Sequence, residues 1–323
     1  MAGVPTTSGW VDSSELGLTL MHEHLFTLNK ELDDNYPGDW DEELRRADAV
    51  DKLHYLESVG VSSLVDLTVL GLGRFIPRVK EVAEHTTINV IVATGVYTYR
   101  DLPLYFHFRG PGRMIDGPEY LTEFLIDDIR EGIAGTGVRA AILKCSTDEI
   151  GVTPDIDRAL RCVAQAHRET GVPITTHTHA ATHRGLDQLR IFDEEGVDPT
   201  RVIIGHSGDS KDRDYLRRLL DTGAYIGMDR FGLDVFATTP ERVATVAQLA
   251  LEGFADQMLL STDAPCFSHN LEPARAEHLP NWNWPHLFDD VIPALREAGI
   301  TDAQLNRMLV DNPRRIFERV DTY

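Results

Sequence analysis

The chain has 323 residues, of which 42% are hydrophobic and 26% are charged, and this balance supports a large folded core and excludes wholesale disorder. The formal net charge of -21 argues against nucleic acid or an anionic membrane surface as the partner, because like charges repel. The start, MAGVPTTSGW, lacks a basic stretch followed by an apolar one, and no run approaches the roughly 18 apolar residues of a membrane helix. We therefore expect a cytoplasmic protein.

The three cysteines, Cys145, Cys162 and Cys266, are widely spaced and form no CxxC pair. An odd number of separated cysteines indicates neither a disulfide framework nor a zinc site built from thiolates. We expect each of them to be a buried thiol rather than a nucleophile.

Short apolar runs of strand length recur along the chain, and each is followed by a stretch of helical periodicity. This alternation is typical of repeated βα units that form a parallel sheet. The runs cover residues 16–24, 62–68, 88–97, 139–145, 172–178, 201–207, 224–229 and 257–263. Eight strands in a chain of this length predict an α/β fold, a (β/α)8 barrel, with residues 1–323 forming one domain.

Amphipathic segments between these runs predict the helices. The clearest cover residues 41–60, 153–171 and 212–223, and each ends in glycine, as helices often do. After the last strand, residues 301–320 predict a C-terminal helical cap in which Pro313 suits the first turn of a second short helix.

Two connections are longer than the loops usual in compact domains, namely residues 98–120 after the third strand and residues 264–288 after the eighth. Both are rich in aromatic residues and proline, and both leave the carboxyl end of a strand. That end holds the active site in a barrel of this type, so we expect these loops to form the substrate pocket, the alternative being that they only cap the barrel.

The stretch TLMHEHLF places His22 and His24 two residues apart in the first strand. Side chains alternate along a strand, so both imidazoles point to the same face. Taken alone, the pair is as well explained by two buried core histidines as by a ligand pair.

The carboxyl ends of the other strands favour a ligand site. Polar groups that are costly to bury stand at equivalent strand ends, and imidazoles with a carboxylate are the ligands of a divalent transition metal. Lys144 is unusual among these groups, because its ammonium would be repelled by a cation. The repulsion is removed if the amine reacts with carbon dioxide to give an anionic carbamate that bridges two metals. The alternative is that the Lys144 ammonium pairs with Asp263. The candidate metal ligands are His22, His24, Lys144, His177, His206 and Asp263.

These motifs together resemble the binuclear-metal amidohydrolase superfamily, in its phosphotriesterase family, and more narrowly the phosphotriesterase-like lactonases. The resemblance is carried in order along nearly the whole chain by HEH, LKC, THT, GHSGD and STD at the strand ends and by TVLGLGRFIPR, ATGVYTYRDLPLYF, GMDRFGLD and VDNPRRIFER. It implies that His22, His24 and Asp263 hold the more buried metal, that His177 and His206 hold the more exposed one, and that carboxylated Lys144 and a hydroxide bridge them.

Further roles are expected beyond metal binding. Asp263 is expected to accept the proton of the nucleophile. Tyr97 is expected to act in catalysis and to bind substrate, the alternative being an aromatic residue packed over the mouth of the barrel. Arg230 is expected to have the same two roles, the alternative being an arginine that caps a helix or pairs at the surface. Asp209 is expected to continue a proton relay or to cap a helix, and His179 to lie just behind the ligands. Substrate contacts in the last loop are expected from Cys266, Phe267 and Trp282.

The function expected from this resemblance is hydrolysis of N-acyl homoserine lactones, of the quorum-quenching type, through attack by the metal-bridging hydroxide, with weak activity on phosphotriesters. A dedicated organophosphate triester hydrolase and a lactonase for other γ- or δ-lactones are the alternatives, and a metal-binding protein without catalysis is disfavoured. Zinc is the first choice of metal, with cobalt, iron and manganese as alternatives, because imidazole and carboxylate accept all of them. The resemblance further implies a homodimer.

Overall fold

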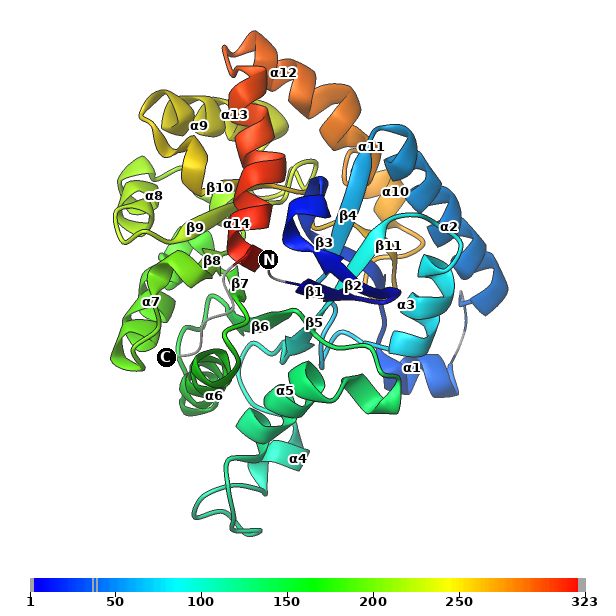
Figure 1. Ribbon diagram of the computed structural model, residues 1–323, viewed down its shortest axis with the longest axis vertical. Helices are drawn as coiled ribbons and strands as arrows, with labels where there is room; N and C mark the ends of the chain where they lie inside the picture. Colours follow the sequence, from blue (N-terminus) through cyan, green and yellow to red (C-terminus); the bar gives the residue numbers. More distant parts are fainter. Residues whose placement is uncertain (1–2, 37, 39, 319–323) are drawn as a thin grey trace.

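A parallel sheet that curls into a barrel forms the centre of the protein in the computed structural model, which describes residues 3–36, 38 and 40–318 (Figure 1). Within these residues the strands follow the order β10-β9-β8-β7-β6-β5-β4-β3-β11. Their bounds are β3 Leu18–Thr27, β4 Val61–Asp66, β5 Asn89–Gly95, β6 Ile142–Thr147, β7 Ile174–Thr178, β8 Val202–Ile204, β9 Tyr225–Met228, β10 Met258–Leu260 and β11 Pro265–Ser268.

The barrel closes where its last strand is interrupted. β10 pairs with β9 on one side, whereas β11 pairs with β3 on the other. Between them, the backbone N–H of Asp263 donates to the carbonyl of His22 at 3.0 Å, and the His22 N–H donates to the Ser261 hydroxyl at 3.0 Å. The two halves of this strand therefore complete the ring, and the predicted (β/α)8 fold is confirmed.

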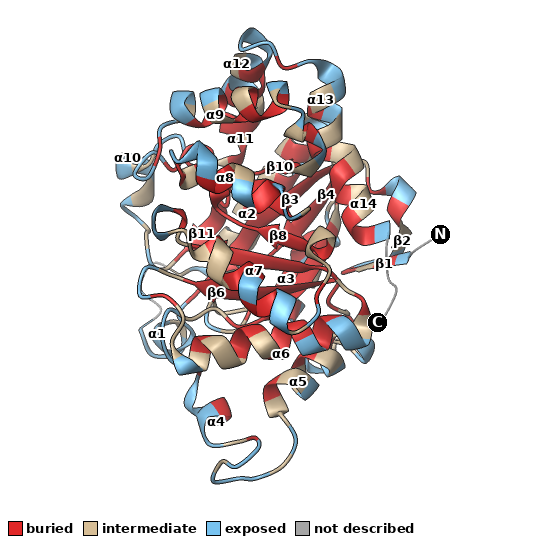
Figure 2. Ribbon diagram, turned by 90° about the vertical axis from the view of Figure 1, so that its left-hand side faces the viewer, coloured by how far each residue is buried: buried red, intermediate tan, exposed pale blue. Residues whose placement is uncertain are grey.

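Helices surround the sheet, with their buried residues toward the strands and their exposed residues outward (Figure 2). Their bounds are α1 Lys30–Asn35, α2 Glu42–Ser58, α3 Ile76–Ala83, α4 Leu104–His107, α5 Tyr120–Arg130, α6 Pro154–Thr170, α7 Arg184–Glu194, α8 Arg213–Leu220, α9 Thr239–Leu251, α10 Arg275–His278, α11 Trp284–His286, α12 Ile292–Glu297, α13 Asp302–Asn306 and α14 Asn312–Glu318. None of the helices in the described residues combines the length and apolar character needed to cross a membrane.

Capping residues mark both ends of the predicted helix over residues 153–171. The side chain of Thr153 accepts from the Ile156 N–H at the start of α6, and Gly171, with a φ of 74°, ends that helix in the left-handed region. The C-terminal cap consists of α13, a π-helical turn over Arg307–Asp311 and α14, whose second residue is Pro313. The end of the predicted cap, residues 319–320, lies outside the described residues.

The prediction missed a hairpin at the amino end of the barrel. Strands β1 (Gly3–Thr6) and β2 (Gly9–Asp12) pair antiparallel, and the Thr7 N–H donates to the Val90 carbonyl at 2.9 Å. Val4 packs in a separate apolar cluster inside the barrel together with Leu16 and residues of the strands. Four-residue strands leave too short a pattern to predict, yet this hairpin covers the end of the barrel opposite the polar strand ends.

The two long connections are present after β5 and β10. The first contains α4 and extends away from the barrel, where it exposes much of its surface (Figure 2). The second contains β11, α10 and α11 and folds back over the barrel. The assignment of residues 1–323 to one domain stays a prediction, and both ends of that range lie outside the described residues.

Candidate active site

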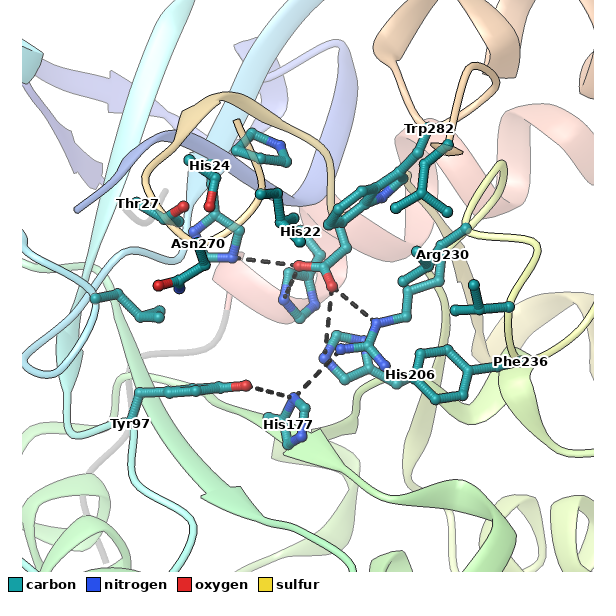
Figure 3. A pocket seen from close by; sticks show the side chains of 18 of the residues that line it. His22, His24, Thr27, Tyr97, His177, His206, Arg230, Phe236, Asn270 and Trp282 are labelled. Carbon is teal, nitrogen blue, oxygen red and sulfur yellow. Dashed lines mark hydrogen bonds and ion pairs between the residues drawn. The ribbon is translucent and has the colours of Figure 1, made fainter. Parts of the chain in front are cut away.

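The six predicted ligand side chains meet in one cavity of about 460 Å³ at the carboxyl ends of the strands. Figure 3 shows the four histidines among them. His22 and His24 come from β3, Lys144 from β6 and His177 from β7. His206 follows β8 and Asp263 follows β10, so residues separated by up to 241 positions in the sequence line the same space. The sequence prediction that these strand ends converge therefore agrees with the structure.

The carboxylate of Asp263 lies at the centre of the cluster. Its Oδ1 is 3.3 Å from Nε2 of His22 and 3.2 Å from Nε2 of His24. Its Oδ2 is 3.8 Å from Nε2 of His206 and accepts a hydrogen bond from Nε of Arg230 at 2.8 Å. Burial favours the neutral acid, but His206, His22 and Arg230 outweigh it and hold the pKa of Asp263 well below its usual range, so the carboxylate is anionic.

A second buried carboxylate, Asp229 at the end of β9, orients two of the imidazoles. Its Oδ2 is 2.9 Å from Nδ1 of His22, and its Oδ1 is 3.0 Å from Nδ1 of His206. Each Nδ1 therefore carries the proton donated to Asp229, which leaves Nε2 as a lone-pair donor facing Asp263. Carboxylates placed behind histidines in this way fix the tautomer and the ring orientation of metal ligands.

The other two imidazoles are held by separate partners. Nδ1 of His24 is 2.9 Å from the hydroxyl of Thr68, which itself donates to Asp66 at 2.5 Å. Nε2 of His177 is 2.7 Å from Oδ2 of Asp148, so it is Nδ1 of this residue that faces the cavity. All four histidines thus present one nitrogen to the same space and use the other to hold their position.

This donor set fits divalent metal ions. His22, His24 and Asp263 offer ligand atoms that all lie within 4.8 Å of one another. Burial lowers the pKa of His22, lowers that of His177 to about 4 and lowers that of His206 well below its usual value. Neutral imidazoles are the form that binds metal, so these residues are ready to act as ligands at neutral pH.

Lys144 is fully enclosed beside these ligands, with its Nζ 2.9 Å from Nε2 of His22. Burial lowers the pKa of its amine to about 8, which makes the uncharged, reactive form accessible. Strand β5 approaches it closely, since a Cβ added to Gly95 would lie 1.9 Å from the Lys144 carbonyl oxygen. Among the described ion pairs, Lys144 forms none with Asp263, the alternative considered from the sequence.

Two residues of the site adopt a backbone conformation that favours glycine. His206 has a φ of 57° and Asp263 has a φ of 56°, both in the left-handed region. Such conformations persist only where the surrounding structure enforces them, and they are concentrated at functional sites. Glu23 supplies the constraint at Asp263, because its carboxylate accepts from the N–H groups of Thr262 and Ala264 on either side.

Tyr97 reaches the cavity from the end of the third predicted strand. Its hydroxyl lies 2.7 Å from that of Tyr99 and 3.4 Å from Nδ1 of His177. Burial raises the pKa of Tyr97 well above its usual value, so the phenol keeps its proton and can donate it in a hydrogen bond. Tyr99, which the sequence reasoning did not single out, lines the cavity beside it.

Arg230 connects Asp263 to a second acid. Its Nη1 donates to Oδ2 of Asp209 at 2.9 Å, and Arg242 on α9 donates to the other oxygen of Asp209. A guanidinium does not release its proton at neutral pH, so this chain of contacts gives no support to the predicted relay from Asp263 to Asp209. Asp209 instead fixes Arg230 in place.

The apolar wall of the cavity differs from the prediction. Trp282 lines it, but Cys266 and Phe267 do not: both are buried outside the cavity, and Arg45 lies 4.3 Å above the Phe267 ring. Pro265 and Ser268 are the residues of β11 that line the cavity. The remaining apolar lining comes from Leu72, Leu233, Val235, Phe236, Leu271 and Leu279.

His179 and most of the long loop after β5 lie outside this cavity. His179 lines an adjoining cavity with Asp148 and His177, and its Nδ1 is 2.8 Å from the Thr182 hydroxyl, so its place behind the ligands stays a prediction. Of the long loop after β5, only Tyr99 lines the main cavity, so most of that loop does not form the pocket. The loop after β9, residues 230–238, takes this place, although its ordinary length gave no signal.

Sequence reasoning missed Asp229, Asp148 and Arg242. Asp229 ends the seventh predicted strand, AYIGMD, so the rule that selected the other strand ends could have found it. Asp148 follows the fourth predicted strand by a few residues and carried a weaker signal. Arg242 lies inside a helix, where no sequence pattern marks it.

The barrel and its convergent histidines, carboxylates and lysine define a metal-dependent hydrolase. The chain belongs to the phosphotriesterase family, whose sequence profile matches residues 2–317.

Similar proteins support this assignment. The chain is 54% identical to a "Phosphotriesterase homology protein" of Mycobacterium tuberculosis over the full length of both chains, and 37% identical to an "Aryldialkylphosphatase" of Saccharolobus solfataricus, covering 95% of this chain and 96% of that one. The structure titled "Structure of the phosphotriesterase from Mycobacterium tuberculosis" superposes with a TM-score of 0.97 at 54% identity, over 99% of this chain and 100% of that one.

Proposed function

We propose that this enzyme hydrolyses N-acyl homoserine lactones and acts more weakly on phosphotriesters. The observation that carries the proposal is the shape of the cavity, which joins a polar metal-ligand cluster to a wall of aliphatic and aromatic side chains. A lactone ring with its carbonyl would lie at the cluster, and the acyl chain would lie along Leu233, Phe236 and Trp282. An apolar wall favours a substrate with an apolar tail.

For the metal centre we propose two divalent ions, with zinc as the first choice and cobalt, iron or manganese as alternatives. His22, His24 and Asp263 would hold one ion, and His177 and His206 would hold the other, with carboxylated Lys144 between them. A cation pair supplies a Lewis acid for the ester carbonyl and lowers the pKa of water. The orientation of every imidazole by a second partner supports this assignment.

Three side chains would transfer the proton and orient the substrate. Asp263 accepts the proton of the attacking water and returns it to the alkoxide that leaves when the ring opens. Tyr97 donates a hydrogen bond to the lactone, which orients the ring at the cluster. Arg230, held by Asp263 and Asp209, presents its remaining N–H groups to the substrate carbonyl or amide.

A dedicated organophosphate triester hydrolase is the second candidate, because the relative from Saccharolobus solfataricus is named an aryldialkylphosphatase. The test is kcat/KM of the metal-loaded enzyme on a long-chain N-acyl homoserine lactone and on an aryl dialkyl phosphate triester, before and after chelation. A chelator-sensitive preference for the lactone supports the proposal. Preference for the triester supports the second candidate. Turnover only of other γ- or δ-lactones would contradict both candidates and assign those lactones as the substrates.

We also propose that the enzyme works in the cytoplasm as a homodimer. All three cysteines are free and buried, as suits a reducing compartment. Exposed apolar side chains on the segment after β5, among them Leu104 and Met114, offer surface for a second copy. Light scattering should give twice the chain mass of 36.1 kDa, and a monomer at micromolar concentration would contradict the dimer.

A further inference from the structure

We propose that Arg242 is a positioning residue that fixes the apolar wall formed by residues 230–238 and thereby sets the enzyme's preference for acyl-chain length. This inference deepens the proposed function and rests on its assignment of that wall to the acyl chain. Arg242 lies on α9, outside the cavity, so it would act through the loop rather than by touching substrate.

The contacts of Arg242 hold this loop from inside. The residue is fully buried, and its guanidinium donates from Nη1 to the Ala237 carbonyl and from Nη2 to the Leu233 carbonyl, the latter at 3.1 Å. These carbonyls belong to a segment without strand partners, so they need donors from elsewhere. One planar group that binds two carbonyls four residues apart fixes the curvature of the segment between them.

The segment between these anchors supplies the wall. Leu233, Val235 and Phe236 line the cavity, and the last two are 66% and 48% exposed. Side chains this exposed gain little rigidity from packing, so the backbone must place them. On the outer side the loop is held by Asp234, which accepts from the Thr239 N–H at 3.0 Å.

Arg242 also connects the wall to the reacting groups. Nη2 of Arg242 donates to Oδ1 of Asp209, whose Oδ2 accepts from Arg230. Arg230 in turn donates to Oδ2 of Asp263. The acyl-chain wall and the carboxylate at the centre of the cluster therefore share one anchor, and the distance between them is set by a chain of charged hydrogen bonds.

An arginine at position 242 is better explained by a positioning role than by a contribution to the stability of the fold. A buried ion pair adds little stability compared with apolar side chains of similar volume, and Nε of Arg242 is buried without a hydrogen-bond partner. Lysine retains the charge but offers a compact ammonium in place of the planar fork. It cannot hold both carbonyls and Asp209 in the same geometry.

The test measures binding rather than turnover. Dissociation constants for hexanoate, octanoate and decanoate are obtained from tryptophan fluorescence of zinc-loaded wild type and Arg242→Lys, since Trp282 lines the cavity. Each fully buried methylene strengthens binding by about fourfold. We expect the wild type to gain affinity steeply with chain length and R242K to lose most of that gain, with hexanoate binding changed little.

Arg201→Lys is the matched control. Arg201 is also a buried arginine that donates to a backbone carbonyl, that of Gly171, but it does not line the cavity. R201K should keep the wild-type chain-length dependence. A variant that is only less stable has a lower folded fraction, which weakens the apparent binding of all three acids by the same factor. The slope of binding affinity against chain length therefore separates a loss of positioning from a loss of stability.

If R242K does not fold, Asp209→Asn tests the same anchor from its other side and should also reduce the slope. A wild-type slope kept in the folded variant overturns the inference, as does a wild type without chain-length dependence. Failure of the proposed function is distinguishable, because a wild type that binds long acids tightly but hydrolyses no lactone contradicts only the lactonase assignment.

Discussion

The metal-ligand cluster and the apolar wall of the cavity lie side by side but are built in opposite ways. The cluster stands on strand ends, and each imidazole has a second partner that fixes its ring. The wall stands on loops, and Val235 and Phe236 are largely exposed. In the proposed function, rigid elements would carry the chemistry, whereas loops would distinguish one substrate from another.

This difference has a measurable consequence. A change in the cluster should lower turnover of every substrate by a similar factor, because under the proposed function all of them would need the same proton acceptor and ligands. A change in the wall should lower turnover of some substrates and spare others. Each variant below is therefore measured on a long-chain lactone, a short-chain lactone and a phosphotriester.

The largest effect is expected for Asp263→Asn. The amide can neither accept the proton nor balance the cation charge, so kcat/KM should fall by about a thousandfold on all three substrates. Steady-state kinetics with metal content measured on the same samples is the check. Loss confined to one substrate would break the distinction between cluster and wall.

Asp229→Asn should be the next in size. The amide cannot receive hydrogen bonds from both His22 and His206 as the carboxylate does, so metal affinity or activity should fall by about 10- to 100-fold. Competition with a chelator measures the affinity. Asp148→Asn, which touches only His177 of the ligands, is the matched control and should have the smaller effect; equal losses would argue against a special role for Asp229.

Phe236→Ala should act selectively. Loss of the ring should lower kcat/KM for the long-chain lactone by about tenfold through lost apolar contact and leave the short-chain lactone nearly unchanged. Leu251→Ala, at another exposed apolar residue that does not line the cavity, should change neither substrate. A uniform loss for F236A would show that the wall also supports the cluster.

The smallest effect is expected at the cysteines, which belong to neither region. Burial raises the pKa of the Cys145, Cys162 and Cys266 thiols to about 12. At pH 8 the thiolate fraction is then about one in ten thousand, so the native protein should not react with a thiol reagent, and reactivity should rise only as pH approaches 12. Thiol titration should count three groups after unfolding, and rapid labelling of native protein would contradict the burial.

Much of the cluster could be predicted because strand ends are visible in the sequence. His22 and His24 reveal their common face through their spacing, and an apolar run followed by a polar residue marks the ends at Lys144, His177, His206 and Asp263. The barrel topology then brings these ends together. Asp229 obeys the same rule at the end of AYIGMD.

The wall could not be predicted in the same way. Their place in a long loop predicts Cys266 and Phe267 in the wall, but the pairing of β11 with β3 puts Phe267 beside Phe26, and neither predicted residue lines the cavity. Register depends on pairing with β3, which is more than 200 positions away in the sequence. No local pattern encodes that pairing, and the same holds for the contact of Arg242 with Asp209.

The sequence by itself determined the alternation of strands and helices, the barrel and the identity of the clustered donors, because hydrophobic periodicity and strand-end polarity are local properties. Only the tertiary structure decided which nitrogen of each imidazole faces the cavity, which loop forms the apolar wall and what holds that wall in place. Those features depend on hydrogen bonds and packing between residues far apart in the chain, whose geometry exists only after the barrel has closed.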